Sequence, residues 1–271
     1  MRKKTPFILL LLIWSLFPFF LQVYTSFSTP DSILQMFTLT KHHWTIDNYL
    51  LVLNAEPPFW RYLLNSTIVG LTSTILTLLL ALPAAYSLSQ ANNRFTKTFR
   101  VFLLLTSLFP YVLLFLSLLE IARRFELGNN LLALSIPYST LSLPLAILLL
   151  SASFKDLPRD LEEAARLEGL NLIQRLRWIL IPLIAPATAS TAIIIFLFSW
   201  NEYPIALTWI SKVSLITLPV AIGRIAGSSV YSVPYGAYAA ATVLGAIPLI
   251  LIVLIFQKQI VSGLTQGAIK G

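Results

Sequence analysis

Polar and small side chains gather in one short stretch of the chain, residues 155–177. The stretch holds no Ser, Thr, Cys or His, so it offers no hydroxyl or thiol nucleophile and no imidazole ligand. At helical spacing, Leu161, Ala164, Ala165 and Leu167 form an apolar strip that includes two small side chains. Such a strip suits close approach by another protein surface. The alternative is an amphipathic helix that lies on lipid headgroups.

The same stretch predicts two short helices joined by a corner. Asp156 is placed to cap the first helix, and Pro158 suits its opening turn. Gly169 is the residue type that ends a helix in the left-handed conformation. Asn171 is a cap for the second helix, which Pro182 closes or bends. Carboxylates near the start of the first helix complement its dipole; they are Asp160, Glu162 and Glu163.

A second group of polar residues lies where apolar stretches begin or end. Amide and carboxylate groups bind sugar hydroxyls, and aromatic faces cover the C–H surface of a sugar ring, so these residues are candidates for a solute path. Hydrogen bonding between helices is the alternative, and it stays open for each of them. The residues are Asn65, Ser66, Trp200, Asn201, Glu202 and Tyr203.

Catalytic and metal-binding patterns are missing from the sequence. There is no Cys, and the only two His residues, His42 and His43, are adjacent, with no ligand set nearby. No phosphate-binding loop of the form G-x-x-x-x-G-K-[ST] occurs. The chain therefore has no ATPase site of its own, and we expect no enzyme activity, no bound cofactor and no metal.

The elements that must position these residues follow from composition. Of 271 residues, 57% are hydrophobic and 11% are charged, and the mean hydropathy is +0.80. An ordinary soluble domain has about 25% charged residues, so we expect an all-α integral membrane protein. Six stretches of at least 18 residues contain no Asp, Glu, Lys or Arg. They are Thr5–Pro30, Tyr62–Asn93, Val101–Leu119, Leu127–Phe154, Trp178–Asn201 and Ile225–Gln257.

These stretches predict one transmembrane domain over residues 1–271, with a coupling loop at 155–177. The expected spans are approximately 7–27, 64–90, 100–121, 130–153, 180–201 and 236–257. We interpret the first span as a retained anchor, because its apolar run is too long for a signal peptide and no cleavage pattern follows. A shorter uncharged piece, Val213–Gly223, is expected to be interfacial or re-entrant.

The distribution of basic residues predicts the orientation. Six of the 19 Lys and Arg residues fall on one side of the six spans (Lys41, Arg61, Arg123, Arg124, Lys212 and Arg224), which leaves 13 on the other. By the positive-inside rule, both termini and residues 155–177 are cytoplasmic. The net charge of +8 then reflects topology in a lipid bilayer, and no nucleic-acid partner is implied.

The spacing in the polar loop carries a family resemblance. Glu163-Ala164-Ala165, three residues, Gly169, nine residues and Ile179-x-Ile181-Pro182 resemble the EAA loop of binding-protein-dependent ABC importer permeases. Ile181 stands where Leu is usual, and Leu170 where a small residue is common. Other segments are similar to the smaller permease subunit of maltose-type sugar importers: Arg61-Tyr-Leu-Leu-Asn65-Ser66, Ser199-Trp200-Asn201-Glu202-Tyr203, Thr217-Leu-Pro219 and Gly263–Gly271.

This resemblance implies a fold, a function and a set of partners. The fold is a type I importer permease of six helices, which forms half of a translocation path for a sugar or sugar-like solute in the cell (inner) membrane. The implied partners are a second homologous permease, a cytoplasmic ABC ATPase dimer that binds ATP and Mg, and an extracytoplasmic solute-binding protein. The implied ATPase-coupling residues are Glu162, Glu163, Ala164, Ala165, Leu167, Gly169 and Leu170.

Two other functional classes are alternatives to the permease. A self-sufficient secondary transporter or channel is favoured by inverted repeats or a buried Asp, Glu or His relay, and the sequence shows neither. An intramembrane enzyme needs clustered His, Asp or Glu within the spans, which is also missing. The sequence names neither the solute nor whether this chain touches it.

Overall fold

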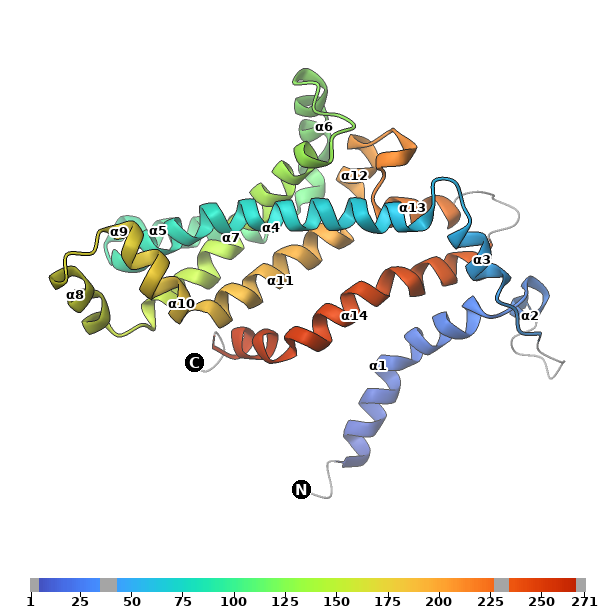
Figure 1. The fold of residues 1–271 in the computed structure, drawn as a ribbon, viewed down its shortest axis with the longest axis horizontal. Coiled ribbons are helices and arrows are strands. Elements are labelled where there is room, and N and C mark those ends of the chain that lie inside the picture. The colour runs from blue at the N-terminus through green and yellow to red at the C-terminus, as the bar shows by residue number, and fades with distance from the viewer. Residues whose placement is uncertain (1–4, 35–42, 227–233, 267–271) are drawn as a thin grey trace.

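The computed structural model describes residues 5–34, 43–226 and 234–266, and over these ranges the chain is a set of helices (Figure 1). Arg2, Lys3, Lys4, Lys41, His42 and residues 267–271, which entered the sequence predictions, lie outside the described residues. The longer helices are α1 (Thr5–Ser26), α4 (Phe59–Gln90), α5 (Arg94–Ser107), α6 (Phe115–Arg124), α7 (Leu131–Lys155), α11 (Ala185–Asn201) and α14 (Tyr235–Gln266).

Shorter elements connect these helices. The connections on the side predicted to be extracytoplasmic are called the outer connections. They contain α2 (Pro30–Leu34), α3 (Asp47–Leu53), α12 (Pro204–Trp209), η3 (Val213–Leu215) and α13 (Leu218–Ala226). The polar loop, residues 155–177, contains α8 (Arg159–Leu167) and α9 (Leu172–Arg175). The π-helical turn η2 (Leu176–Leu180) and α10 (Ile181–Leu183) lead from it into α11, and η1 (Tyr111–Leu114) precedes α6. In the described part of the chain the only β-type pairing is a single bridge between Ser28 and Trp44.

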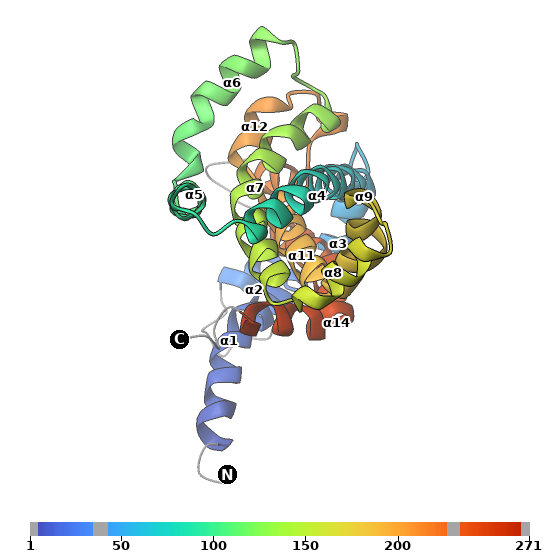
Figure 2. The same ribbon diagram turned by 90° about the vertical axis from the view of Figure 1, so that its left-hand side faces the viewer.

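The centre of the molecule is the pair α4 and α7, onto which α5 and α11 pack (Figure 2). Buried side chains of these helices, among them Ala85, Leu150 and Ile195, form one continuous apolar core. Small residues let the helices approach closely: a Cβ at Gly70 of α4 would lie 2.7 Å from Cε2 of Phe196 on α11. A buried hydroxyl pair, Thr77 to Ser139 at 3.2 Å, links α4 to α7.

Two helices lie outside this centre. α14 packs along α11, and α1 contacts α14 but projects away from the bundle toward the N-terminus (Figure 1). Apolar side chains of α1 are widely exposed; Trp14, for example, is 81% exposed. A helix with this much exposed apolar surface requires lipid or a second protein around it.

The helices agree with a polytopic membrane protein. Among the described residues, four helices are long and apolar enough to cross a bilayer, or up to six if each of two bent pairs is one span. The six apolar stretches expected from the sequence overlap α1, α4, α5–α6, α7, η2–α11 and α14. Residues 227–233 of the sixth stretch lie outside the described residues. The pairs bend by 82° after Ser107 and by 83° after Leu183. Pro110 lies in the first break and Pro182 beside the second, where each removes a helix donor.

The polar loop and the outer connections lie at opposite ends of the bundle. In Figure 1, α8 and α9 are at the left end, while α3, α12 and α13 are toward the right. The segment Val213–Gly223 folds back onto α4 and α14 rather than extending away. Ile216, Leu218 and Val220 in this segment are at most 2% exposed. It is therefore part of the packed core, where a purely interfacial segment would be half exposed.

Candidate functional site

The corner between α8 and α9 is fixed by local backbone rules. Gly169 has φ +80°, the left-handed conformation that glycine adopts without strain. Its N–H donates to the Arg166 carbonyl, and the N–H of Leu170 donates to the Ala165 carbonyl, which is the Schellman arrangement. Asn171 and Gln174 then form a reciprocal capping box at the start of α9. The predicted roles of Gly169 and Asn171 are thus present in the structure.

The start of α8 differs from the prediction. Asp156 was expected to cap α8, but it is the residue that follows the end of α7. Pro158 was expected inside the first turn and instead occupies the capping position in an extended conformation. The reason is steric, because the ring of Pro158 disfavours helical backbone at Leu157. The carboxylates Asp160 and Glu162 do lie in the first turn, as expected.

The two faces of α8 are different. Leu161, Glu163, Ala164 and Leu167 are exposed, and Leu167 is 90% exposed. Ala165 is only 3% exposed and faces the bundle. The predicted apolar strip is therefore wrong in one member, since Ala165 packs inside the protein while the other three residues remain outside.

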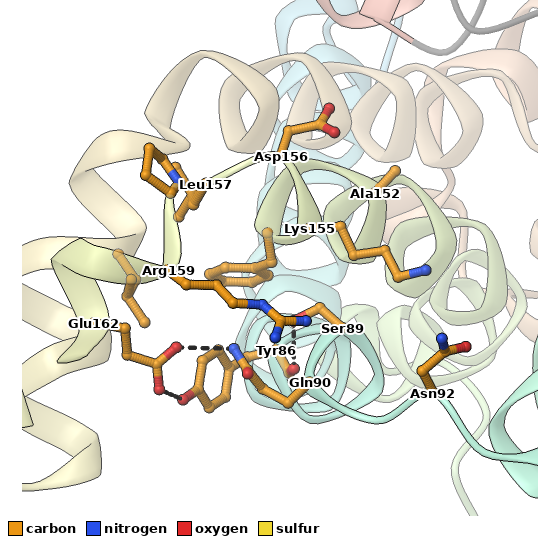
Figure 3. Close-up of a pocket in the computed structure, with 13 residues that line it drawn as sticks. Tyr86, Ser89, Gln90, Asn92, Ala152, Lys155, Asp156, Leu157, Arg159 and Glu162 are labelled. Atoms are coloured by element: carbon orange, nitrogen blue, oxygen red, sulfur yellow. Dashed lines mark hydrogen bonds between the residues drawn. The ribbon is translucent and has the colours of Figure 1, made fainter.

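Glu162 is a buried carboxylate at the centre of a polar cluster. The sequence predicts that Glu162 is part of the ATPase-coupling surface, yet it is 9% exposed and turned toward α4 (Figure 3). Its carboxylate accepts hydrogen bonds from the Tyr86 hydroxyl, from Gln90 Nε2 at 2.9 Å and from Arg166 at 2.7 Å. Arg175 of α9 donates to it at 3.2 Å. We call Tyr86, Gln90, Glu162, Arg166 and Arg175 the Glu162 cluster.

The charges of this cluster keep Glu162 ionised. Burial by itself raises the pKa of the Glu162 carboxyl, but hydrogen bonds from Tyr86 and Arg166 and the charges of Arg166 and Arg175 outweigh it. The pKa of Glu162 consequently lies below its ordinary value. A cavity of about 590 Å³ lies beside the cluster, between α8 and the ends of α4 and α7, and Tyr86, Gln90 and Glu162 are part of its lining. The cluster is thus a principal link between the α8–α9 corner and the bundle.

The predicted solute-path residues are mostly internal. Asn65 donates to the carbonyls of Ser214 at 3.1 Å and Ile216 at 2.9 Å. The neighbouring Ser66 hydroxyl accepts from the Leu218 N–H at 2.8 Å. Both side chains are at most 4% exposed. They hold the folded-back segment Val213–Gly223, which we call the outer segment, against α4. We therefore withdraw Asn65 and Ser66 as solute ligands.

Glu202 and Trp200 also belong to the interior. Glu202 is 3% exposed and accepts hydrogen bonds from the Tyr138 hydroxyl at 2.5 Å and from the N–H groups of Ile205 and Ala206. It therefore caps α12 and joins it to α7. Trp200 is 3% exposed and packs against the Phe196 ring. Neither residue is free to meet a solute.

Asn201 and Tyr203 are the two residues of this group that reach the surface. Asn201 is exposed and donates to the Leu197 carbonyl of its own helix at 2.8 Å. Tyr203 is 37% exposed, and its ring edge lies over Gly223, where a Cβ would come within 2.8 Å of Cε2. A role in the solute path stays a prediction for these two residues.

We predict that Asn65→Ala destabilises the protein while Asn201→Ala does not. The first change leaves two carbonyls of the outer segment without their donor, and an unsatisfied buried group costs about 1–3 kcal/mol. The second removes one exposed bond within a helix. Thermal unfolding of the two purified variants in detergent measures the difference. Equal melting temperatures would mean that Asn65 does not hold the outer segment.

Comparison with known proteins identifies the family. A family model described as the binding-protein-dependent transport system inner membrane component matches residues 77–266, more than half of the chain. The chain belongs to this family. The expected resemblance to ABC importer permeases is thereby confirmed, and the alternative of a self-sufficient transporter or channel is set aside. Family members are transport subunits of the inner membrane that work with a separate ATPase and a binding protein.

Relatives and a solved structure extend this result over nearly the whole permease. The sulfoquinovosyl glycerol transport system permease protein SmoH of Agrobacterium fabrum is 36% identical over 97% of this chain and 91% of its own. The trehalose/maltose transport system permease protein MalG of Thermococcus litoralis is also 36% identical, over 97% of this chain and 94% of its own. A chain of a bacterial ABC transporter that imports alginate has a TM-score of 0.75 at 23% identity, covering 95% of this chain and 98% of its own. The predicted all-α permease fold is confirmed.

Proposed function

We propose that this permease forms half of the translocation path of an ATP-driven importer for a sugar or sugar-like solute. One observation carries the solute class: relatives aligned over 97% of the chain are permeases of sugar and sugar-glycoside transport systems. The corner of α8 and α9 is the proposed contact with the ATPase. It presents Glu163, Ala164 and Leu167 outward at one end of the bundle, with Gly169 and Leu170 shaping the turn.

The proposed assembly contains three kinds of protein partner. A second, homologous permease completes the path, and the exposed apolar surface of α1 supports a neighbouring chain or lipid on that side. An ABC ATPase dimer lies in the cytoplasm. Both termini of the permease are on the same side, because 13 of its 19 basic residues fall there. The solute-binding protein docks on the outer connections. ATP and Mg belong to the ATPase, and this chain binds no cofactor.

The proposal predicts sugar-stimulated ATP hydrolysis by the assembled complex. The permease, its partner permease, the ATPase and the binding protein are purified together and placed in nanodiscs. Neutral disaccharides, polyols and sugar glycosides are then added one at a time, and phosphate release is measured. We expect at least one of them to raise hydrolysis severalfold, and only when the binding protein is present.

Controls separate transport from unspecific activation. The same panel is tested without the binding protein and with amino acids in place of sugars. Stimulation by an amino acid, with none by any sugar, would overturn the sugar assignment and leave the family membership intact.

A further inference from the structure

Three basic side chains meet at the start of the third span. Lys97 and Arg100 lie in the first two turns of α5, and Lys155 is the last residue of α7, which packs against α5. The charges of Arg100 and Lys97 act on Lys155, so the three groups repel one another. We call Lys97, Arg100 and Lys155 the basic cluster. In the described part of the chain, the ion pairs are those of Glu162, and none involves this cluster.

The surroundings of the basic cluster do not neutralise it. From Ala91 to Leu119 the sequence contains no Asp or Glu. Asp156 follows Lys155 directly, but the two side chains leave the end of α7 in different directions (Figure 3). Arg100 donates from Nη2 to the Leu88 carbonyl at 2.7 Å, which fixes its position at the end of α4, while the two lysines are exposed. The cluster therefore offers a site for an anionic partner.

An exposed apolar stripe continues from Lys97 along α5. At about 100° per residue, Val101, Leu104 and the cap residue Leu108 lie within about 40° of Lys97 around the helix axis. Their side chains are 50–72% exposed. With a rise of about 1.5 Å per residue, the stripe from Lys97 to Leu108 is about 16 Å long, which is close to half of a hydrocarbon core about 30 Å thick. The stripe therefore has the length of one lipid leaflet.

Aromatic rings flank the basic start of α5. Phe95, Phe99 and Phe102 form a row of stacked rings, with neighbouring centroids 6.1 and 6.2 Å apart, and all three are exposed. Arg94 precedes the row as the first residue of the helix. Basic groups beside exposed Phe and Leu side chains are typical of helix segments at the boundary between lipid headgroups and acyl chains. This end of α5 consequently lies at the headgroup level, and the stripe extends into the apolar layer.

One kind of molecule combines the two properties that these residues select. The basic cluster selects a negative charge, and the stripe selects a hydrocarbon chain about one leaflet long. An anionic phospholipid has both. The distribution of basic residues predicts that this end of α5 is cytoplasmic, and anionic lipids of the cytoplasmic leaflet attract basic residues near the membrane surface. A second permease would instead have to supply acidic groups and an apolar face in matching positions.

We propose that the basic cluster is a binding site for the headgroup phosphate of an anionic phospholipid, with one acyl chain along the apolar stripe of α5. Lys97 and Lys155 approach the phosphate from α5 and α7, and Arg100 contributes its charge from its fixed position. The bound lipid relieves the repulsion within the cluster and so holds the start of α5 against the end of α7. This site is separate from the proposed contact with the ATPase, and it does not depend on which solute is transported.

Contact quenching by brominated lipids tests this site. The chain has no Cys, so Leu105→Cys, at a position beside the stripe that is 62% exposed, gives one attachment point for a fluorescent dye in a complex whose other subunits are made cysteine-free. The complex is placed in phosphatidylcholine nanodiscs that contain a rising share of brominated phosphatidylglycerol, which is anionic, or of brominated phosphatidylcholine, which has no net charge. We expect the anionic lipid to reach half of its full quenching at about one fifth of the share that the neutral lipid needs. About 1 M salt should remove most of this preference.

Charge variants identify the groups responsible. Lys97→Gln combined with Lys155→Gln removes two charges of the basic cluster, so the two brominated lipids should then quench almost equally. Lys97→Arg combined with Lys155→Arg keeps the charges and should keep the preference. Arg159→Gln is the matched control, because Arg159 is an exposed basic residue of α8 on the same predicted side of the membrane and outside the cluster. It should leave the preference unchanged.

The proposal fails if the lipid preference is absent or has another origin. Equal quenching by the two lipids without any charge variant would mean that the cluster does not select an anion. Weak quenching by both would mean that the second permease covers the stripe. If Arg159→Gln lowers the preference as much as the paired lysine change does, the preference reflects only the overall charge of the complex. If inorganic phosphate removes the preference while sodium chloride of equal ionic strength does not, the cluster binds a free anion and no lipid.

Discussion

Replacing Glu162 with glutamine is expected to uncouple ATP hydrolysis from solute and to lower the stability of the permease. Glu162 is the counter-charge of Arg175, whose side chain is only 12% exposed. Breaking a buried ion pair by removing one partner costs about 3–5 kcal/mol, because the other charge stays buried. Glutamine keeps the shape but removes the charge, so α8 loses its firmest attachment to the ends of α4 and α9.

Glu163→Gln is the control for this change. Glu163 is the neighbouring acid on the same helix, but it is exposed and lies outside the Glu162 cluster. We expect Glu163→Gln to keep the melting temperature of the isolated permease and to weaken only binding of the ATPase. Glu162→Gln should lower the melting temperature and the sugar-stimulated hydrolysis together. If both variants unfold at the wild-type temperature, the cluster does not anchor α8.

The pH dependence gives an independent reading of the same cluster. Since the pKa of folded Glu162 lies below its ordinary value, ionised Glu162 stabilises the folded state above the unfolded pKa. That contribution is lost as the pH falls through the folded pKa. The difference in melting temperature between wild type and Glu162→Gln should therefore be largest near neutral pH and shrink in acid. A difference that is constant down to the folded pKa would contradict the charge-based explanation.

Local rules predicted much of the coupling corner. Gly169 and Asn171 act through bonds to residues within five positions of themselves, so their roles are visible in the sequence. The orientation of α8 is different. Glu162 and Glu163 are adjacent carboxylates, and helical spacing groups Glu162 with Ala165 and Arg166, but nothing local says which face turns inward. That is decided by Tyr86 and Gln90, which are 76 and 72 residues away.

For Asn65, Ser66, Trp200 and Glu202, the structure shows internal partners that the sequence did not indicate, for a related reason. Polar residues at the ends of apolar spans suggest either a ligand or a structural partner, and the sequence does not show the partner. Asn65 and Ser66 bind backbone groups 149 to 152 residues away. Pro110 indicates irregular packing in the third span. The size of the bend there, 82° between Ser107 and Tyr111, depends on tertiary contacts that the sequence does not show.

Glu202→Ala is expected to be the most damaging change in the outer half of the permease. The side chain is the acceptor for the Tyr138 hydroxyl and for the N–H groups of Ile205 and Ala206. Each of these buried donors loses its partner in the variant, at about 1–3 kcal/mol for each group left unsatisfied. Alanine also leaves a void next to Tyr138, which is fully buried. We expect a lower yield, a lower melting temperature and loss of transport in parallel.

Tyr138→Phe separates the two parts of this effect. It removes the hydroxyl but leaves Glu202 bonded to the start of α12, so its loss of stability should be smaller than that of Glu202→Ala. Because Tyr138 and Glu202 are in contact, the double variant should lose less than the sum of the single losses. Thermal unfolding of the four proteins gives this comparison directly. If Glu202→Ala instead unfolds at the wild-type temperature while sugar uptake alone falls, Glu202 acts on the solute. Its hydrogen bonds to Tyr138 and to the start of α12 would then not be what holds α12 against α7.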